Sequence, residues 1–160
     1  MQTIQTTTEV TDVKATDLPQ VAKWYADEWA NSPTDTQAEE RILKSLQERL
    51  QNKKIYAMKV VRVGEELAGV ACLQERDMGD AHLELTPWLA GVYVKDEYRH
   101  KGIGLLLSKA IVQEVRNQKF PVCYLFSDKM ESWYREQGWE TIGLETYKGM
   151  QVAVMKYEVR

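Results

Sequence analysis

A turn able to bind phosphate groups is the clearest chemical feature of the sequence, over residues 99–104, R-H-K-G-I-G. The turn lies between an apolar run, Trp88 to Val94, and a helical pattern that starts at Gly102. A helix N-terminus offers unpaired N–H groups and partial positive charge, and glycines let the backbone approach phosphate oxygens without an intervening Cβ. Lys101 adds a cation near the same place. These residues predict a site for a diphosphate.

Other phosphate-binding motifs do not fit this segment. The dinucleotide-binding pattern G-x-G-x-x-G is absent, and the next predicted strand, Val122 to Phe126, lacks the acidic residue that would bind a ribose. No G-K-[ST] sequence occurs, so a Walker loop is excluded. An ordinary strand-to-helix turn stays open as the alternative, because R-x-x-G-x-G is a short pattern.

Two segments together resemble the GNAT (Gcn5-related N-acetyltransferase) superfamily. Residues 99–104, after an apolar strand, resemble motif A, (Q/R)-x-x-G-x-(G/A). Residues 127–139 resemble motif B, N-x-x-A-x-x-x-Y-x-x-x-G-(F/W), with Ser127 where Asn is common and Tyr134 on the motif tyrosine. The family often has Gly where His100 stands, so a positive φ at that position would strain the histidine mildly.

The resemblance implies an enzyme that moves an acetyl group from acetyl-CoA directly to an amine, without a metal. It implies that Tyr134 protonates the departing thiolate, and that the backbone of Val92 and Val94 binds the pantetheine arm. An acyltransferase using another short acyl-CoA and an acyl-CoA-binding sensor without turnover remain alternatives. The residues that the resemblance assigns to cofactor binding are Val92, Tyr93, Val94, Arg99, His100, Lys101, Gly102, Ile103, Gly104 and Ser127.

A general base for the amine is harder to assign. An amine with a pKa near 10.4 is mostly protonated at neutral pH, so a base would assist the attack. Glu84, just before the central strand, is the best-placed carboxylate, directly or through a water, and His82 is a weaker rival. The position that the family most often uses aligns with Trp88, which cannot accept a proton. Trp24, Trp29 and Trp88 either line an acceptor cleft or belong to the core.

The elements that must position these residues follow from the periodicity of apolar side chains. Asp17 before Pro19 predicts a helix start, and the Asn31-Ser32-Pro33 cluster predicts its end. Gly91, inside the central strand, marks either a bulge or a plain strand position. The remaining predicted helices are 36–51, 102–118 and 128–137, and the predicted strands are 8–14, 55–63, 67–74, 88–94, 122–126, 139–147 and 151–159. Together they predict an α/β fold, GNAT-like, with a mixed, mostly antiparallel sheet of six or seven strands, a central parallel pair and helices on both faces.

Length, charge and composition limit the kinds of domain, partner and location that are expected for the chain. The chain has 160 residues, which suits a single domain over 1–160, and its net charge of −3 with dispersed Lys and Arg argues against nucleic acid as a partner. Cys72 and Cys123 lie in apolar runs and are expected to be reduced core thiols. No segment is apolar enough for a membrane span, and the first ten residues lack a signal pattern, which predicts a cytoplasmic location. The expected partner is a small-molecule or peptide amine, and a homodimer stays open.

Overall fold

Seven strands and four α-helices occupy the part of the chain that this computed structural model describes, residues 6–30 and 34–159. The helices are α1 (Leu18–Trp29), α2 (Ala38–Gln51), α3 (Ile103–Asn117) and α4 (Glu131–Glu136). The strands are β1 (Thr8–Asp12), β2 (Ile55–Val63), β3 (Glu66–Gln74), β4 (Trp88–Val94), β5 (Val122–Ser127), β6 (Glu140–Tyr147) and β7 (Met150–Glu158). Every predicted element occurs, and the Asn31-Ser32-Pro33 cluster lies outside the described residues.

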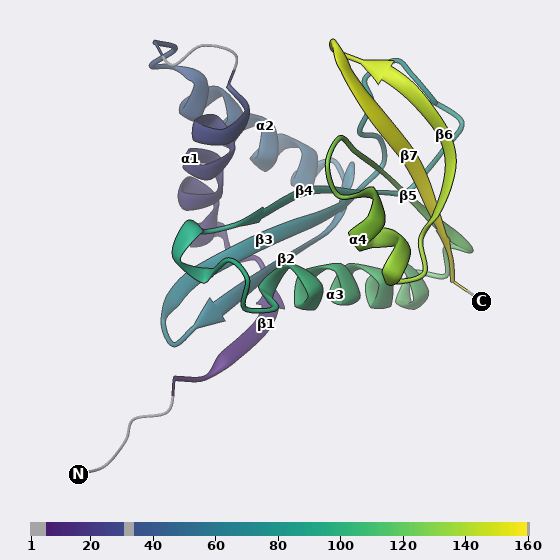
Figure 1. Ribbon diagram of the computed structural model, residues 1–160. Helices are drawn as coiled ribbons and strands as arrows, with labels where there is room; N and C mark the ends of the chain where they lie inside the picture. The colour runs from purple at the N-terminus through teal and green to yellow at the C-terminus, as the bar shows by residue number, and fades with distance from the viewer. Residues whose placement is uncertain (1–5, 31–33, 160) are drawn as a thin grey trace.

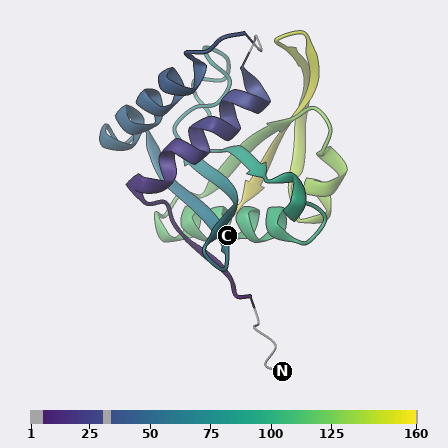
Figure 2. The same cartoon turned by 90° about the vertical axis from the view of Figure 1, so that its left-hand side faces the viewer.

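The strands form one sheet in the order β1-β2-β3-β4-β5-β7-β6. All neighbouring strands are antiparallel except β4 and β5, which are parallel because α3 connects them as a crossover. Figures 1 and 2 show α1 and α2 over one face of the sheet and α3 over the other. The predicted mixed sheet with one parallel pair and helices on both faces is therefore confirmed.

The core is divided by the sheet into an α1–α2 side and an α3–α4 side. In β3, Val70 and Cys72 pack with buried residues of α1 and α2, whereas Ala71 and Leu73 pack with buried residues of α3. Tyr134 of α4 belongs to the same cluster as α3. A group on one side of the sheet can therefore meet a group on the other side only where two strands separate.

Both cysteines are free and buried, as predicted. Burial raises the pKa of the Cys72 thiol to about 11 and that of the Cys123 thiol to about 12. A thiol with such a pKa is protonated at neutral pH and is a poor nucleophile. The two residues contribute packing to the core.

The central strand β4 is distorted at Gly91, where φ is 60°. Its register with β3 passes from the pair Tyr93–Val70 to the pair Ala90–Cys72, so two residues of β4 oppose one residue of β3. This confirms a β-bulge at Gly91. On its other side β4 pairs with β5 at one position only, Trp88 with Tyr124. Beyond that pair the parallel strands separate.

Two helix starts differ from the sequence-based expectation. The Asp17 carboxylate does not cap α1; it accepts from the N–H of Lys14 at 2.8 Å and pairs with Arg62 of β2, because a 3-10 turn already precedes the helix. The helix α4 starts three residues later than predicted, at Glu131. The Ser127 hydroxyl accepts from the N–H of Met130 at 2.9 Å, and this bond holds the intervening residues in a bend.

Among the described residues, no helix is both long and apolar enough to cross a membrane.

Candidate active site

The turn before α3 presents a row of backbone donors. His100 and Gly102 both adopt left-handed conformations, with φ of 62° and 83°, and turn the chain from β4 into the helix. None of the N–H groups from His100 to Leu105 donates to another described residue. Consecutive free N–H groups at a helix N-terminus form a site for an anion. The turn therefore offers donors to an anion, and the diphosphate that the sequence predicts there stays a prediction.

The basic residues of the turn have different surroundings. Arg99 folds back on β4: its Nε donates to the Val94 carbonyl at 2.9 Å, its Nη1 pairs with Asp96 at 2.7 Å, and its guanidinium lies 5.6 Å from the Tyr93 ring centre. These contacts brace the turn against the strand. The Lys101 ammonium is exposed and lies 5.9 Å from the centre of the Tyr98 ring, so it is the cation more available to an incoming anion.

The two glycines of the turn serve different purposes. A Cβ at Gly102 would meet no atom within 4 Å, so this residue is needed for its positive φ. A Cβ at Gly104 would lie 3.7 Å from the Trp133 indole and 4.0 Å from Val94. Here the first turn of α3, the end of β4 and α4 come close together, and a small residue keeps the space between them.

The separated edge of β4 lies next to this turn. Beyond Trp88, no strand of the described residues pairs with β4 on the side of β5. The Val92 and Val94 side chains pack with the α3 side of the core, and Tyr93 between them packs with the α1 side. The side chains are thus occupied by packing. The strand offers its backbone at residues 92–94 toward the space between β4 and β5, although the Val94 carbonyl already accepts from Arg99.

Tyr134 lies on the α3–α4 side of this opening. Its ring contacts Trp133 and Trp139 edge-on, at 4.9 Å and 5.9 Å between ring centres. Burial raises the pKa of Tyr134 to about 12, so its hydroxyl is protonated at neutral pH. The hydroxyl donates to no described residue. Among the described residues, Thr11 Oγ1 is the one side-chain oxygen or nitrogen that is both fully buried and without a partner. The Tyr134 hydroxyl is not fully buried, so it keeps some contact with solvent. It is free to donate to a ligand.

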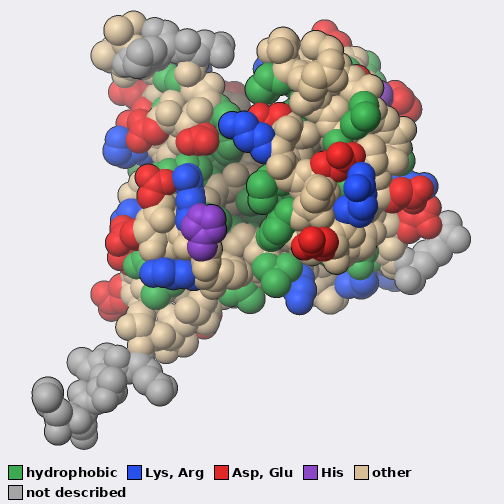
Figure 3. Space-filling view, viewed as in Figure 1, with side chains coloured by type: hydrophobic (Ala, Val, Ile, Leu, Met, Phe, Trp, Pro, Cys, Tyr) green, Lys and Arg blue, Asp and Glu red, His purple; other side chains and the backbone are tan. Residues whose placement is uncertain are grey.

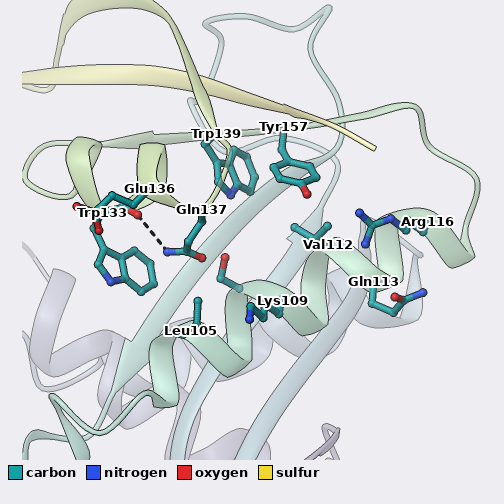
Figure 4. Close-up of a pocket in the computed structure, with 11 residues that line it drawn as sticks. Leu105, Lys109, Val112, Gln113, Arg116, Trp133, Glu136, Gln137, Trp139 and Tyr157 are labelled. Atoms are coloured by element: carbon teal, nitrogen blue, oxygen red, sulfur yellow. Dashed lines mark hydrogen bonds between the residues drawn. The ribbon is translucent and has the colours of Figure 1, made fainter. Parts of the chain in front are cut away.

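A groove of about 650 Å³ lies along α3. Figure 4 shows it between α3 and the segment from α4 to β6, with Lys109 and Arg116 on one wall and Trp139 and Tyr157 on the other. Leu105 at one end follows Gly104 directly. The groove therefore begins at the residue that follows the turn in the chain.

Glu84 lies in the connection between β3 and β4 and is far more solvent-exposed than Tyr134, with 73% of its side chain accessible. Its carboxylate is 3.7 Å from Nδ1 of His82, and Nε2 of His82 is 2.8 Å from Glu145 of β6. The structure thus brings the two predicted base candidates together with each other and with β6. None of their contacts within the described residues joins them to the bulge at Gly91.

The structure separates the three tryptophans for which cleft and core were both open. Trp24 stacks on Tyr93 at 5.2 Å, and Trp29, half exposed, meets the same ring edge-on at 6.4 Å. Trp88 is buried in a different cluster, where its indole N–H donates to the Leu85 carbonyl at 2.8 Å. Trp24 and Trp29 face the α1 side of β4, whereas Trp88 is a core residue. Figure 3 shows the surface hollowed between the α1–α2 part and the β6–β7 part of the molecule.

Sequence reasoning missed two residues on the α1–α2 side of the sheet. The Tyr25 hydroxyl donates to the Gly91 carbonyl at 2.6 Å and so fixes the bulge from α1. Asp77, in the connection after β3, is partly buried on the same side of the sheet. Tyr25 occurs in an apolar helical pattern and Asp77 in a polar loop, so neither position carries a local signal of its role.

Comparisons with known proteins agree with this geometry. The family model described as an acetyltransferase (GNAT) domain matches residues 21–159. No curated protein sequence matches the chain significantly.

No group of three or more His, Cys, Asp or Glu side chains within the described residues could hold a metal ion.

Solved structures share the fold over nearly the whole chain. An N-acetyltransferase from Staphylococcus aureus Mu50 has a TM-score of 0.77 and 14% identity, covering 96% of this chain and 99% of its own. YncA from Salmonella typhimurium, solved with its cofactor acetyl-CoA, has a TM-score of 0.74 and 14% identity over 96% and 94% of the two chains. A ribosomal-protein-alanine N-acetyltransferase from Brucella melitensis has a TM-score of 0.72 and 22% identity over 94% and 99%. At these identities the likeness concerns the fold.

Proposed function

Because the chain belongs to the GNAT acetyltransferase family, we propose that it transfers an acetyl group from acetyl-CoA to the nitrogen of an amine. One observation carries the proposal. The parallel strands β4 and β5 share a single pair, Trp88 with Tyr124, and then separate directly beside a turn whose N–H groups are free. A slot next to an anion site suits a ligand that has a diphosphate and a narrow arm. We propose that one domain, residues 1–160, carries both the cofactor and the acceptor site.

The cofactor roles follow the order of the contacts along this slot. The N–H groups from His100 to Leu105 would bind the diphosphate, and Lys101 would add a charge. The backbone of residues 92–94 would bind the pantetheine arm. The groove along α3 would receive the part of the cofactor beyond the diphosphate, with Lys109 and Arg116 available to a further phosphate.

The cofactor supplies a thioester that an amine can attack directly. Tyr134 would hold its phenolic proton toward the leaving sulfur and transfer it as negative charge develops there. Ser127 supports this arrangement indirectly, since its cap on Met130 sets where α4 begins. Glu84 stays a candidate base that would act through solvent, given its exposure.

The test has two parts. Acetyl-CoA or CoA at about 100 times its Kd should stabilise the native state by about 2.7 kcal/mol, whereas NAD and ATP should give much smaller shifts. Release of free thiol from acetyl-CoA should then be measured with polyamines, aminoglycosides, free amino acids and peptides with free N-termini. Binding without turnover in the whole panel, or faster turnover with propionyl-CoA or succinyl-CoA, would replace the proposal by a sensor or by another acyltransferase. A larger shift with NAD or ATP would remove its basis.

A further inference from the structure

Asp77 lies in the connection after β3 and is held in place by its neighbours. The next residue, Met78, is 1% exposed and packs with Trp88 and with β7, which anchors the chain at this point. The Asp77 carboxylate lies 3.4 Å from Nε2 of Gln74, and the Gln74 oxygen in turn accepts from Arg49 of α2 at 3.2 Å. The carboxylate is therefore held by the end of β3 and, through Gln74, by α2.

Charged and titratable groups from four elements surround this carboxylate. Arg49 of α2 and Lys148 of the β6–β7 turn both act to lower its pKa, but burial outweighs them and raises the pKa of Asp77 to about 7. Tyr25 of α1 and Cys72 of β3 are also near this carboxylate. Burial is the main cause that raises the pKa of both groups, and the negative charge of Asp77 raises both pKa values further. Asp77 thus lies on the α1–α2 side of the sheet, near the hydroxyl that holds Gly91.

The carboxylate is not engaged in a structural ion pair. Neither Arg49 nor Lys148 comes within 4.0 Å of it, and its one side-chain hydrogen bond within the described residues is the long one to Gln74. Its lone pairs are mostly uncommitted. A partly buried carboxylate without a close cation lowers the free energy of unfolding. Such a destabilising group is more typical of a functional site than of a structural one.

We propose that Asp77 is the general base that takes the proton from the acceptor amine, on the α1–α2 side of the sheet and opposite Tyr134. This inference rests on the proposed acetyl transfer. The nitrogen forms a bond to the thioester carbonyl carbon, and the carbon–sulfur bond breaks with its electron pair on sulfur. The acceptor ammonium loses two protons in all. The first passes through the Asp77 carboxylate to solvent before the attack, and the second goes to the same carboxylate as the amide forms, while the sulfur takes a proton from the Tyr134 hydroxyl.

A base with a pKa near 7 is better matched to this task than an ordinary carboxylate. Proton transfer from an ammonium to a group of pKa about 7 is roughly 10³-fold more favourable than transfer to one of pKa about 3.8. Such a group is also mostly ionised at pH 7.5 or above, so it is ready to accept. Glu84, by contrast, is exposed and faces His82.

The test is the pH profile of kcat/KM for Asp77→Asn, with Asp80→Asn as the matched control. Asp80 is an exposed carboxylate in the same connection. The assay is thiol release from acetyl-CoA with the acceptor that gives the fastest wild-type turnover. Calorimetric binding of acetyl-CoA by each protein is measured beside it. The isosteric Asn removes a buried charge and so should not prevent folding.

Asp77→Asn should lower kcat/KM by about 10²-fold or more near pH 7.5 and remove the acidic limb that the wild type shows near pH 7. The loss should shrink toward pH 10, where solvent neutralises the amine. Acetyl-CoA binding should change less than about twofold, and Asp80→Asn should resemble the wild type. The assignment would be overturned if Asp77→Asn kept the acidic limb, or if Glu84→Gln lost it instead. A wild type that binds acetyl-CoA with no turnover at all would instead refute the proposed function itself.

Discussion

Removal of the Asp77 charge should stabilise the native protein at high pH and leave its stability nearly unchanged at low pH. Burial raises the pKa of Asp77 from 3.8 to about 7 in the native state, whereas the unfolded chain keeps the ordinary value. Between these values the native state holds a proton that the unfolded state has lost. The free energy of unfolding therefore falls as pH rises from about 4 to about 7, and the loss is complete above 7. Asn at this position does not titrate and escapes the loss.

The magnitude follows from the difference between the two pKa values. A difference of roughly three units corresponds to a ceiling of about 4 kcal/mol. The side chain is only partly buried, and solvent and the Lys148 ammonium can adjust to the ionised form, which reduces the effect. We expect Asp77→Asn to exceed the wild type by about 2 kcal/mol at pH 8, with a gap close to zero near pH 4.

Urea unfolding of the wild type, Asp77→Asn and Asp80→Asn at several pH values measures this gap. All other carboxylates titrate equally in the three proteins, so the differences isolate position 77. Asp80→Asn should follow the wild type at every pH. A gap that does not grow with pH would mean that Asp77 titrates normally in the native state, and the reasoning for its role as a base would lose its support.

Three further substitutions test other parts of the site. Tyr134→Phe keeps the ring and removes the hydroxyl, so kcat should fall about 10²-fold with acetyl-CoA affinity unchanged; a wild-type rate across the pH range would return Tyr134 to a packing role. Gly102→Val places a branched side chain at a φ of 83° and should weaken CoA binding at least about tenfold while circular dichroism shows a folded protein. Unchanged affinity would move the phosphate site elsewhere. Tyr25→Phe leaves the Gly91 carbonyl without its 2.6 Å bond and should lower the free energy of unfolding by about 1–2 kcal/mol, which urea denaturation would detect or exclude.

Local patterns were sufficient to predict most of the fold and the anion-binding turn. Strand and helix periodicity, together with Gly102 and Gly104, are properties of a few consecutive residues, and a helix start with free N–H groups follows from them. The sequence does not distinguish a bulge from a plain strand position at Gly91, because glycine occurs in both. The φ of 60° and the shifted register with β3 show that Gly91 forms a bulge. The start of α4 was predicted too early because the Ser127 hydroxyl cap competes with the first helical turn.

The candidate base could not be predicted because its properties are created by distant residues. Asp77 owes its environment to α1, α2 and the β6–β7 turn, which lie far from it in the chain. Glu84 is close to β4 in sequence, which favours it as a base, but in the structure its side chain lies near His82 and is largely exposed to solvent. Short sequence separation is a poor guide in a long connection, since its side chains can reach either face of a sheet. Asp17 illustrates the same limit, because its partner Arg62 belongs to β2.

The placement of the two proposed proton-transfer groups on opposite sides of the sheet has a consequence for pH dependence. Asp77, with a pKa of about 7, is ionised where Tyr134, with a pKa of about 12, is still protonated. Over the wide pH range between these two values, Asp77 is in the form that accepts a proton and Tyr134 is in the form that donates one. In the proposed reaction Asp77 takes the proton from the amine on one side of the sheet, and Tyr134 gives its proton to the sulfur on the other. Activity should therefore rise through pH 7 and stay high into the alkaline range, limited there by the stability of the protein rather than by loss of the acid.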